Sequence, residues 1–133
     1  MELYYHYLLD TNIFIDVLRG YPPAIDWLKS LSASSVLLSV PVIVRMELIL
    51  GTRNKIEQQR ITKLLDEFST EHIAVDDSKW AMEQFEDLYL SHQIEIMDCL
   101  IGAIAFRLKT PIFTRNKKHF APLPDVEVRI PYS

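Results

Sequence analysis

The sequence predicts an α/β fold, a three-layer sandwich in which helices cover both faces of a mainly parallel sheet of four to five strands. Short apolar runs alternate with segments in which apolar residues recur at helical spacing. The chain contains only three glycines, which argues against a loop-rich all-β protein. Alternating strands and helices build a parallel sheet, because each crossover between parallel strands is long enough to hold a helix.

The predicted strands are five short apolar runs with the length and residue types of buried strands. They occupy residues 6–9, 36–38, 73–75, 112–113 and 126–128. The predicted helices lie between them, at residues 12–19, 41–51, 55–68, 78–91 and 98–108. Gly20 ends the first helix, Pro41 and Gly51 bound the second, and Asn54 followed by Glu57 predicts a capping box.

Length and composition predict one domain, residues 1–133, with the 49% apolar and 24% charged residues of an ordinary globular protein. The single Cys99 has no partner for an internal disulfide, and no stretch has the roughly 20 apolar residues that span a membrane. We therefore expect a cytoplasmic protein that does not associate with membranes. The net charge of −4 argues against nucleic-acid binding, unless a metal ion reverses the charge of clustered acids.

Asp10 directly follows the first predicted strand and precedes a helix. Ligands of parallel α/β sheets bind beyond the carboxyl ends of the strands, so this carboxylate stands where a functional group is expected. Asp10 or Thr11 can equally cap the helix that follows. The position of Asp10 alone therefore leaves both interpretations open.

Glu47 lies in a predicted helix whose neighbouring positions are apolar, namely Ile43, Val44, Leu50 and Gly51. A buried carboxylate without a partner costs several kcal/mol, so Glu47 needs a metal ion, a cation or a proton. Arg45 is two residues away and points in another direction on a helix. A salt bridge to another segment is the structural alternative.

Asp98 begins the most apolar helix of the chain, where it can be a helix cap or a ligand. Its helical neighbours turn it toward the core, and the small Gly102 and Ala105 leave room for a carboxylate and an ion. Three acids on separate elements suit a hard cation such as Mg²⁺ or Mn²⁺. No His or Cys pair has the spacing of a zinc site.

A segment rich in cations follows the fourth strand, at residues 114–119. Thr114 and Asn116 supply neutral oxygens, and Arg115, Lys117 and Lys118 are placed to hold phosphates of a nucleic acid beside the acids. The alternative is a solvated surface loop.

Four segments together resemble the PIN-domain nucleases, and most closely the VapC-type toxins of prokaryotic toxin–antitoxin pairs. They are Leu9-Asp10-Thr11-Asn12, Glu47-Leu48-Ile49-Leu50-Gly51, Asp98-Cys99-Leu100-Ile101-Gly102-Ala103 and Thr114-Arg115-Asn116 followed by His119-Phe120. The resemblance covers essentially the whole chain, and the four segments occur in the order of the family.

The resemblance implies an endoribonuclease that hydrolyses RNA phosphodiesters with water activated by Mg²⁺ or Mn²⁺. Asp10, Glu47 and Asp98 would be the metal ligands and, with Asn116, the catalytic residues; Thr11, Thr114, Arg115, Lys117 and Lys118 would contact RNA. Many family members carry a fourth acid where this chain has Asn116, so the implied charge balance favours one resident ion, with a second arriving with substrate. Glu95 could add charge near the site.

The resemblance also implies a VapB-type antitoxin as a partner and a homodimer. Phe14, Tyr21 and Trp27, on an early pair of helices, would offer an apolar surface or belong to the core. Two other functions fit parts of the sequence. A phosphatase would use Asp10 as nucleophile, but the dehalogenase-like pattern has a second acid two residues later, and this chain has Asn12 there. A catalytically silent PIN-like module that binds RNA or protein would keep the fold alone.

Overall fold

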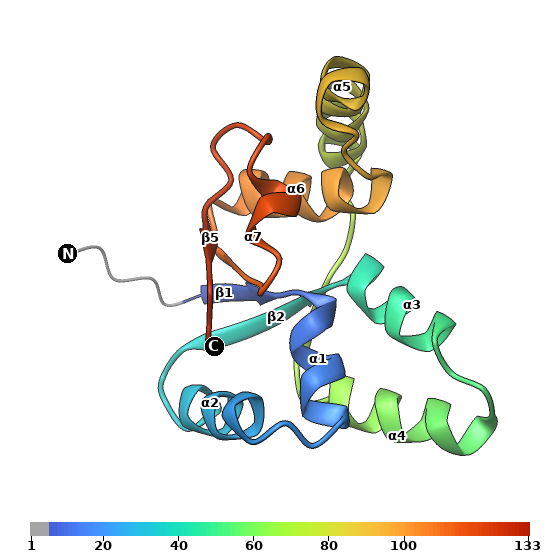
Figure 1. Cartoon of the computed structure of the whole chain (residues 1–133), viewed down its shortest axis with the longest axis vertical. Coiled ribbons are helices and arrows are strands. Elements are labelled where there is room, and N and C mark those ends of the chain that lie inside the picture. Colours follow the sequence, from blue (N-terminus) through green and yellow to red (C-terminus); the bar gives the residue numbers. More distant parts are fainter. Residues whose placement is uncertain (1–5) are drawn as a thin grey trace.

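The computed structural model describes residues 6–133, and these residues form a five-stranded sheet with helices on both faces (Figure 1). The strands are β1 (His6–Leu9), β2 (Leu37–Pro41), β3 (Ser69–Glu71), β4 (Ile112–Phe113) and β5 (Val128–Arg129). They lie in the order β3-β2-β1-β4-β5, and every pair is parallel. The predicted α/β sandwich with a parallel sheet of four to five strands is confirmed.

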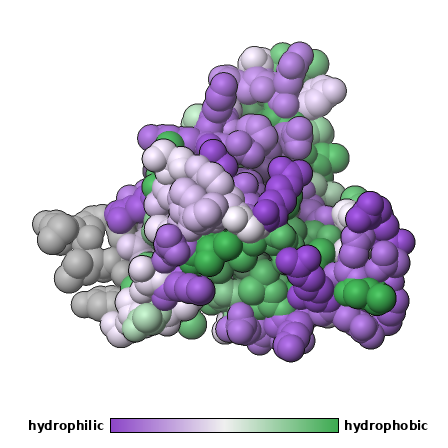
Figure 2. All heavy atoms as spheres, turned by 60° about the horizontal axis from the view of Figure 1, so that its bottom comes forward, coloured by the Kyte–Doolittle hydropathy of each residue, from purple (hydrophilic) through white to green (hydrophobic). Residues whose placement is uncertain are grey.

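Seven helices occur within residues 6–133. They are α1 (Thr11–Leu18), α2 (Pro22–Ser32), α3 (Val42–Leu50), α4 (Lys55–Leu65), α5 (Val75–His92), α6 (Ile96–Leu108) and α7 (Lys117–Phe120). In Figure 1, α1, α2 and α4 lie on one side of the strands, α5, α6 and α7 lie on the other, and α3 lies beyond the end of β2. Seen from the side of α2 and α4, hydrophobic residues gather in the centre of the surface and hydrophilic ones surround them (Figure 2).

The central strand β1 determines where polar residues can meet. It pairs with β2 on one side and with β4 on the other, with Leu9 opposite Phe113. Leu8 and Leu9 are fully buried, as expected for a strand covered on both faces. Because β1 and β4 are parallel and in register, the residues that follow them, Asp10 and Thr114, leave the sheet side by side.

The third strand was predicted in the wrong place. It is Ser69–Glu71, paired with β2, whereas residues 73–75 lead into α5. The reason is a helix cap: the Asp77 carboxylate accepts a hydrogen bond of 2.7 Å from the main-chain N–H of Ala74, which starts α5 at Val75. The apolar side chains of Ile73 and Val75 are exposed.

The other elements differ from prediction mainly at their ends. The strands β2 and β5 are displaced from residues 36–38 and 126–128, and α7 occupies a segment expected to be a loop. The predicted capping box is half formed. Asn54 accepts from the main-chain N–H of Glu57, but the Glu57 carboxylate binds the main-chain N–H and guanidinium of Arg53.

An ion pair with one buried partner joins α5 to α6. The Arg107 guanidinium donates to Asp77 at 2.8 Å, and the Asp77 side chain is only 1% exposed. The expected apolar surface of α1 and α2 belongs largely to the core: Phe14 is fully buried, and Trp27 packs edge-on against Phe113. Across residues 6–133, none of the helices combines the length and apolar character needed to cross a membrane.

Candidate active site

Asp10 is buried at the junction between β1 and α1, and its carboxylate accepts three hydrogen bonds. Oδ1 accepts from the main-chain N–H of Thr11 at 2.8 Å. Oδ2 accepts from the Thr114 hydroxyl at 2.8 Å and from the Asn12 amide at 3.2 Å. Asp10 is therefore a helix cap, as one interpretation predicted, and it also lies at the edge where functional groups were expected. Burial raises the pKa of Asp10, and the bonds from Thr114 and Thr11 offset part of that rise.

Thr114, fully buried after β4, connects three parts of the site through its hydroxyl. The hydroxyl donates to Asp10 and accepts from the Asn12 amide at 2.8 Å and from the main-chain N–H of Asn116 at 3.1 Å. A hydroxyl has one proton and two lone pairs, and all three are used here. Thr114 is thus a support for Asp10 and has no hydrogen-bonding capacity left for RNA.

Glu47 lies on α3 at the rim of the site and is half-buried. Its Oε1 accepts a hydrogen bond of 3.2 Å from the Thr11 hydroxyl. Burial raises the pKa of Glu47, the bond from Thr11 opposes that rise, and repulsion from Asp10 and Glu95 adds to it. The prediction that Glu47 lies on a buried apolar face is only partly confirmed, because its neighbour Ile43 is buried but Leu50 is exposed. Arg45, as expected, is no partner; it pairs with Asp66 at 2.6 Å.

Asp98 lies in the first turn of α6 and is buried. Burial and then repulsion from Asp10 raise its pKa to about 7, with smaller contributions from Glu95 and Glu47. The imidazole of His119 lies 3.7 Å from Asp98 Oδ2 and opposes the rise when it is charged. The sequence predicted that Gly102 leaves room for an ion, but the structure shows another reason for the glycine. A Cβ at this position would lie 2.5 Å from the side chain of Leu123, so the glycine makes room for that side chain.

Burial is the largest cause of the raised pKa of all three carboxylates, and repulsion between acids adds to it at Glu47 and Asp98. The pKa of each is raised, and Asp10 and Glu47 both contribute to the rise at Asp98. Within the described residues no three His, Cys, Asp or Glu side chains are already gathered as ligands of one metal ion. The donor set nevertheless fits a hard divalent cation, because it consists of carboxylate oxygens whose charges lack basic partners close by, apart from His119.

The cation-rich segment after β4 divides into two groups. Asn116, Lys117 and Lys118 are exposed at the start of α7, where contact with a substrate is open to them. The Arg115 guanidinium instead donates to Asp16 at 2.8 Å. Its main-chain N–H donates to the Asn12 amide oxygen at 3.0 Å.

Sequence reasoning missed four residues that support the site: Asn12, Asp16, His119 and Tyr132. The sequence places Asn12 in the first segment of the family resemblance and uses it as an argument against a phosphatase, but predicts no supporting role for it. In the structure its amide binds Asp10, Thr114 and Arg115. Only the short distance of Asn12 from Asp10 in the sequence could have indicated this role.

Two hollows flank the acids. One of about 570 Å³ lies between α1, α3 and α4, with Glu47 and Arg53 on its wall and Ile15, Leu18 and Ile61 among its apolar lining. The other, of about 170 Å³, is lined by Asp98, Glu95, Lys118 and His119. The acidic centre therefore lies between a larger groove of mixed apolar and charged lining and a smaller polar one.

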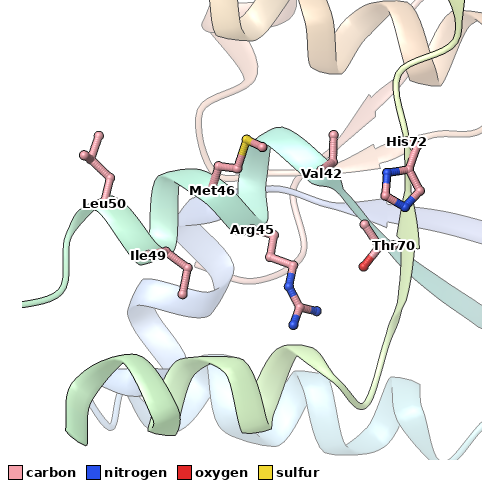
Figure 3. A pocket seen from close by; sticks show the side chains of 7 residues that line it. All are labelled: Val42, Arg45, Met46, Ile49, Leu50, Thr70 and His72. Carbon is pink, nitrogen blue, oxygen red and sulfur yellow. The ribbon is translucent and has the colours of Figure 1, made fainter. Parts of the chain in front are cut away.

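A third hollow, of about 550 Å³, lies apart from the acids, between α3 and β3. In Figure 3, Arg45 and Ile49 point from α3 toward α4, whereas Met46 and Leu50 project from the opposite side of the helix. The exposed fractions of Met46 and Leu50 are 65% and 86%. This surface is apolar and lacks the acids of the candidate site.

Comparison with known proteins gives consistent matches along the chain. The family model of the PIN domain matches residues 7–124. Ribonuclease VapC19 of Mycobacterium tuberculosis is 31% identical over 128 residues, which cover 90% of this chain and 96% of the relative. A toxin–antitoxin complex from Klebsiella pneumoniae contains a chain that is 28% identical, with a TM-score of 0.75 and coverage of 96% of this chain and 98% of that one. VapBC2 from Rickettsia felis bound to promoter DNA shares the fold, with a TM-score of 0.79, 22% identity and coverage of 93% and 97%.

Proposed function

This chain belongs to the PIN-domain family, in its VapC-type branch, and from that membership and the acidic centre we propose that it is a divalent-metal-dependent endoribonuclease, the toxin of a toxin–antitoxin pair. The observation that carries the proposal is the convergence of Asp10, Glu47 and Asp98 at one edge of the sheet, where burial and then repulsion from Asp10 raise the pKa of Asp98 to about 7. A folded protein tolerates such repulsion at a site that binds a cation.

In this proposal, Asp10, Asp98 and Glu47 hold one resident Mg²⁺ or Mn²⁺ ion. When bound, such an ion would supply polarisation of the scissile phosphate and a lowered pKa for water at the site. The bonds from Thr114, Asn12 and the Thr11 main chain orient Asp10 and favour its ionised form against the effect of burial. Asn116 stands at the start of α7, where its neutral amide can contact RNA without adding a fourth negative charge. Lys117 and Lys118 bind the RNA backbone beside the acids.

The experiment is cleavage of a structured RNA by the purified chain, with Mg²⁺ or Mn²⁺ and with a chelator. We expect cleavage that needs the metal ion and that is lost in Asp10→Asn and Asp98→Asn but kept in the control Asp87→Asn, which changes an exposed acid on α5. RNA binding without cleavage by the unmodified protein would favour a silent binding module. Covalent labelling of Asp10 by a phosphate mimic would favour a phosphatase.

The proposed toxin needs an antitoxin, and the groove between α1, α3 and α4 suits one. Its lining combines apolar side chains such as Ile15, Leu18 and Ile61 with the charged Arg19, Glu47, Arg53 and Glu57. A basic side chain of a partner segment lying beside Glu47 could reach the carboxylates. We expect Leu18→Arg to prevent inhibition by the antitoxin encoded beside this gene while RNA cleavage continues. Inhibition that is unchanged in Leu18→Arg would place the antitoxin elsewhere.

The exposed apolar side of α3, formed by Met46 and Leu50, is the surface that we propose for a homodimer. It replaces the surface expected on α1 and α2, whose Phe14 is buried. Two copies would cover side chains that otherwise remain in water. This part of the proposal is independent of the nuclease activity and is tested by the mass of the particle in solution.

A further inference from the structure

Arg115 lies in a clamp formed by Asp16, Tyr21 and Tyr132. Its guanidinium carbon is 5.6 Å from the centroid of each tyrosine ring. One guanidinium nitrogen donates to Asp16 Oδ2 at 2.8 Å, and the Tyr132 hydroxyl donates to the same oxygen at 2.7 Å. The side chain of Arg115 is therefore held by an ion pair and by two aromatic rings.

The clamp joins segments that are far apart in the sequence. Asp16 lies on α1, Tyr21 precedes α2, Arg115 follows β4, and Tyr132 lies after β5. The Tyr21 hydroxyl donates to the main-chain oxygen of Ser133 at 2.7 Å, which ties the end of the described chain to the same place.

The charges of the clamp are fixed by its own hydrogen bonds. Burial alone would raise the pKa of Asp16, but hydrogen bonds from Tyr132 and Arg115 bring it below its usual value. Burial and the bond to Asp16 raise the pKa of Tyr132, so its hydroxyl stays a donor. Asp16 therefore remains an ionised acceptor for both groups at neutral pH.

The main chain of Arg115 connects the clamp to the acidic centre. Its N–H donates to Asn12 Oδ1, and the NH₂ group of the same amide donates to Asp10 Oδ2 and to Thr114. An amide side chain has one accepting end and one donating end. With its oxygen bound by Arg115, Asn12 must turn its NH₂ group toward Asp10.

We propose that Arg115 and Tyr132 are positioning residues for the acidic centre, which hold Asn12 in the orientation that fixes the Asp10 carboxylate. This inference rests on the proposed nuclease function and gives Arg115 a role different from phosphate contact. The clamp binds one guanidinium nitrogen through Asp16 and places two neighbouring rings, whose centroids are 6.0 Å apart, against the guanidinium. The residues act on Asp10 through Asn12 and do not touch the reacting groups.

The test uses Tyr132→Phe, which removes the hydroxyl and keeps the ring, and Arg115→Lys, which keeps the charge. Tyr89→Phe on α5 is the matched control. Two quantities are measured at 25 °C: kcat and KM for RNA cleavage, and the Kd of the RNA-free protein for Mn²⁺ by titration calorimetry. We expect each clamp variant to lower kcat and weaken Mn²⁺ binding by about tenfold, as for other outer partners of metal ligands, with KM nearly unchanged.

A double variant tests whether Arg115 and Tyr132 act together through Asn12 or as two independent contacts. Because both residues act through the same Asn12 amide, Tyr132→Phe combined with Arg115→Lys should be little worse than Arg115→Lys alone. A role in general stability would lower the melting temperature while leaving kcat and the Mn²⁺ Kd at 25 °C unchanged, and that result would overturn the inference.

The remaining outcomes are also decisive. A raised KM with unchanged kcat and Mn²⁺ affinity would make Arg115 a phosphate contact. If the unmodified protein cleaves no RNA, the proposed function fails. The Mn²⁺ titration still tests the positioning role in that case. Equal Mn²⁺ Kd values for Tyr132→Phe and the unmodified protein would show that the clamp does not position the acidic centre.

Discussion

Replacing Asp98 by asparagine should make the protein more stable at alkaline pH while abolishing its activity. The folded-state pKa of Asp98 is raised from 3.8 to about 7, first by burial and then by repulsion from Asp10. A raised pKa means that the folded protein binds this proton more tightly than the unfolded chain does. The contribution of protonated Asp98 to the unfolding free energy is therefore fully present below about pH 4, near the pKa of the unfolded chain. It is lost as the pH rises through about 7, the pKa in the folded protein.

The size of the effect follows from the two pKa values. The difference between 3.8 and about 7 corresponds to at most about 4 kcal/mol, since each tenfold change in proton affinity is worth about 1.4 kcal/mol. The asparagine amide must also be desolvated, so we expect Asp98→Asn to gain about 2 kcal/mol at pH 8 and almost nothing at pH 4.

Urea denaturation at several pH values measures this gain. The quantity of interest is the difference in unfolding free energy between Asp98→Asn and the unmodified protein, because groups remote from Asp98 titrate equally in both. Asp87→Asn, at an exposed position, is the control. Mn²⁺ should reduce the difference at pH 8 by stabilising the unmodified protein alone. A difference that does not change between pH 4 and pH 8 would refute the electrostatic account of the site.

Three further predictions concern the support of the fold, the support of Asp10 and the apolar surface. Asp77→Ala removes both the cap of α5 and the partner of Arg107, and should cost about 3 kcal/mol in urea denaturation, whereas the exposed Asp76→Ala should cost less than about 0.5 kcal/mol. Thr114→Val should lose about 2 kcal/mol and most RNA cleavage because it leaves buried polar groups unpaired, and Thr114→Ser should keep both. Met46→Lys combined with Leu50→Lys should yield monomers in light scattering with unchanged unfolding free energy; a stable dimer in this variant would place the interface elsewhere.

The fold was largely predictable because its signals are local. Apolar periodicity identified β1, β4 and α6 nearly to the residue. The third strand failed because Ile73 and Val75 are apolar but exposed, and their position is set by the cap that Asp77 provides. Apolar character alone does not reveal which side a residue faces.

Asp10 and Asp98 could be identified from their positions at a strand end and a helix start, and Glu47 from its apolar helix face, but the residues that support these acids could not. Thr114 was identified as an RNA contact, and in the structure its hydroxyl is used by Asp10 and Asn12. The hydrogen bond from Arg115 to Asn12 joins residues 103 positions apart, and the one from Tyr132 to Asp16 spans 116 positions. Contacts across such separations leave no local periodicity in the sequence.

The position of β1 between β2 and β4 also has a kinetic consequence. The hydrogen bond between Thr114 and Asp10 closes a loop of 104 residues, so its entropic cost must be met before the contacts at this edge stabilise the chain. Pairing of β1 with β2 closes a much shorter loop and is expected to form earlier in refolding. During refolding, the chain should therefore be compact for an interval before the contacts between Thr114 and Asp10 form and the protein becomes active.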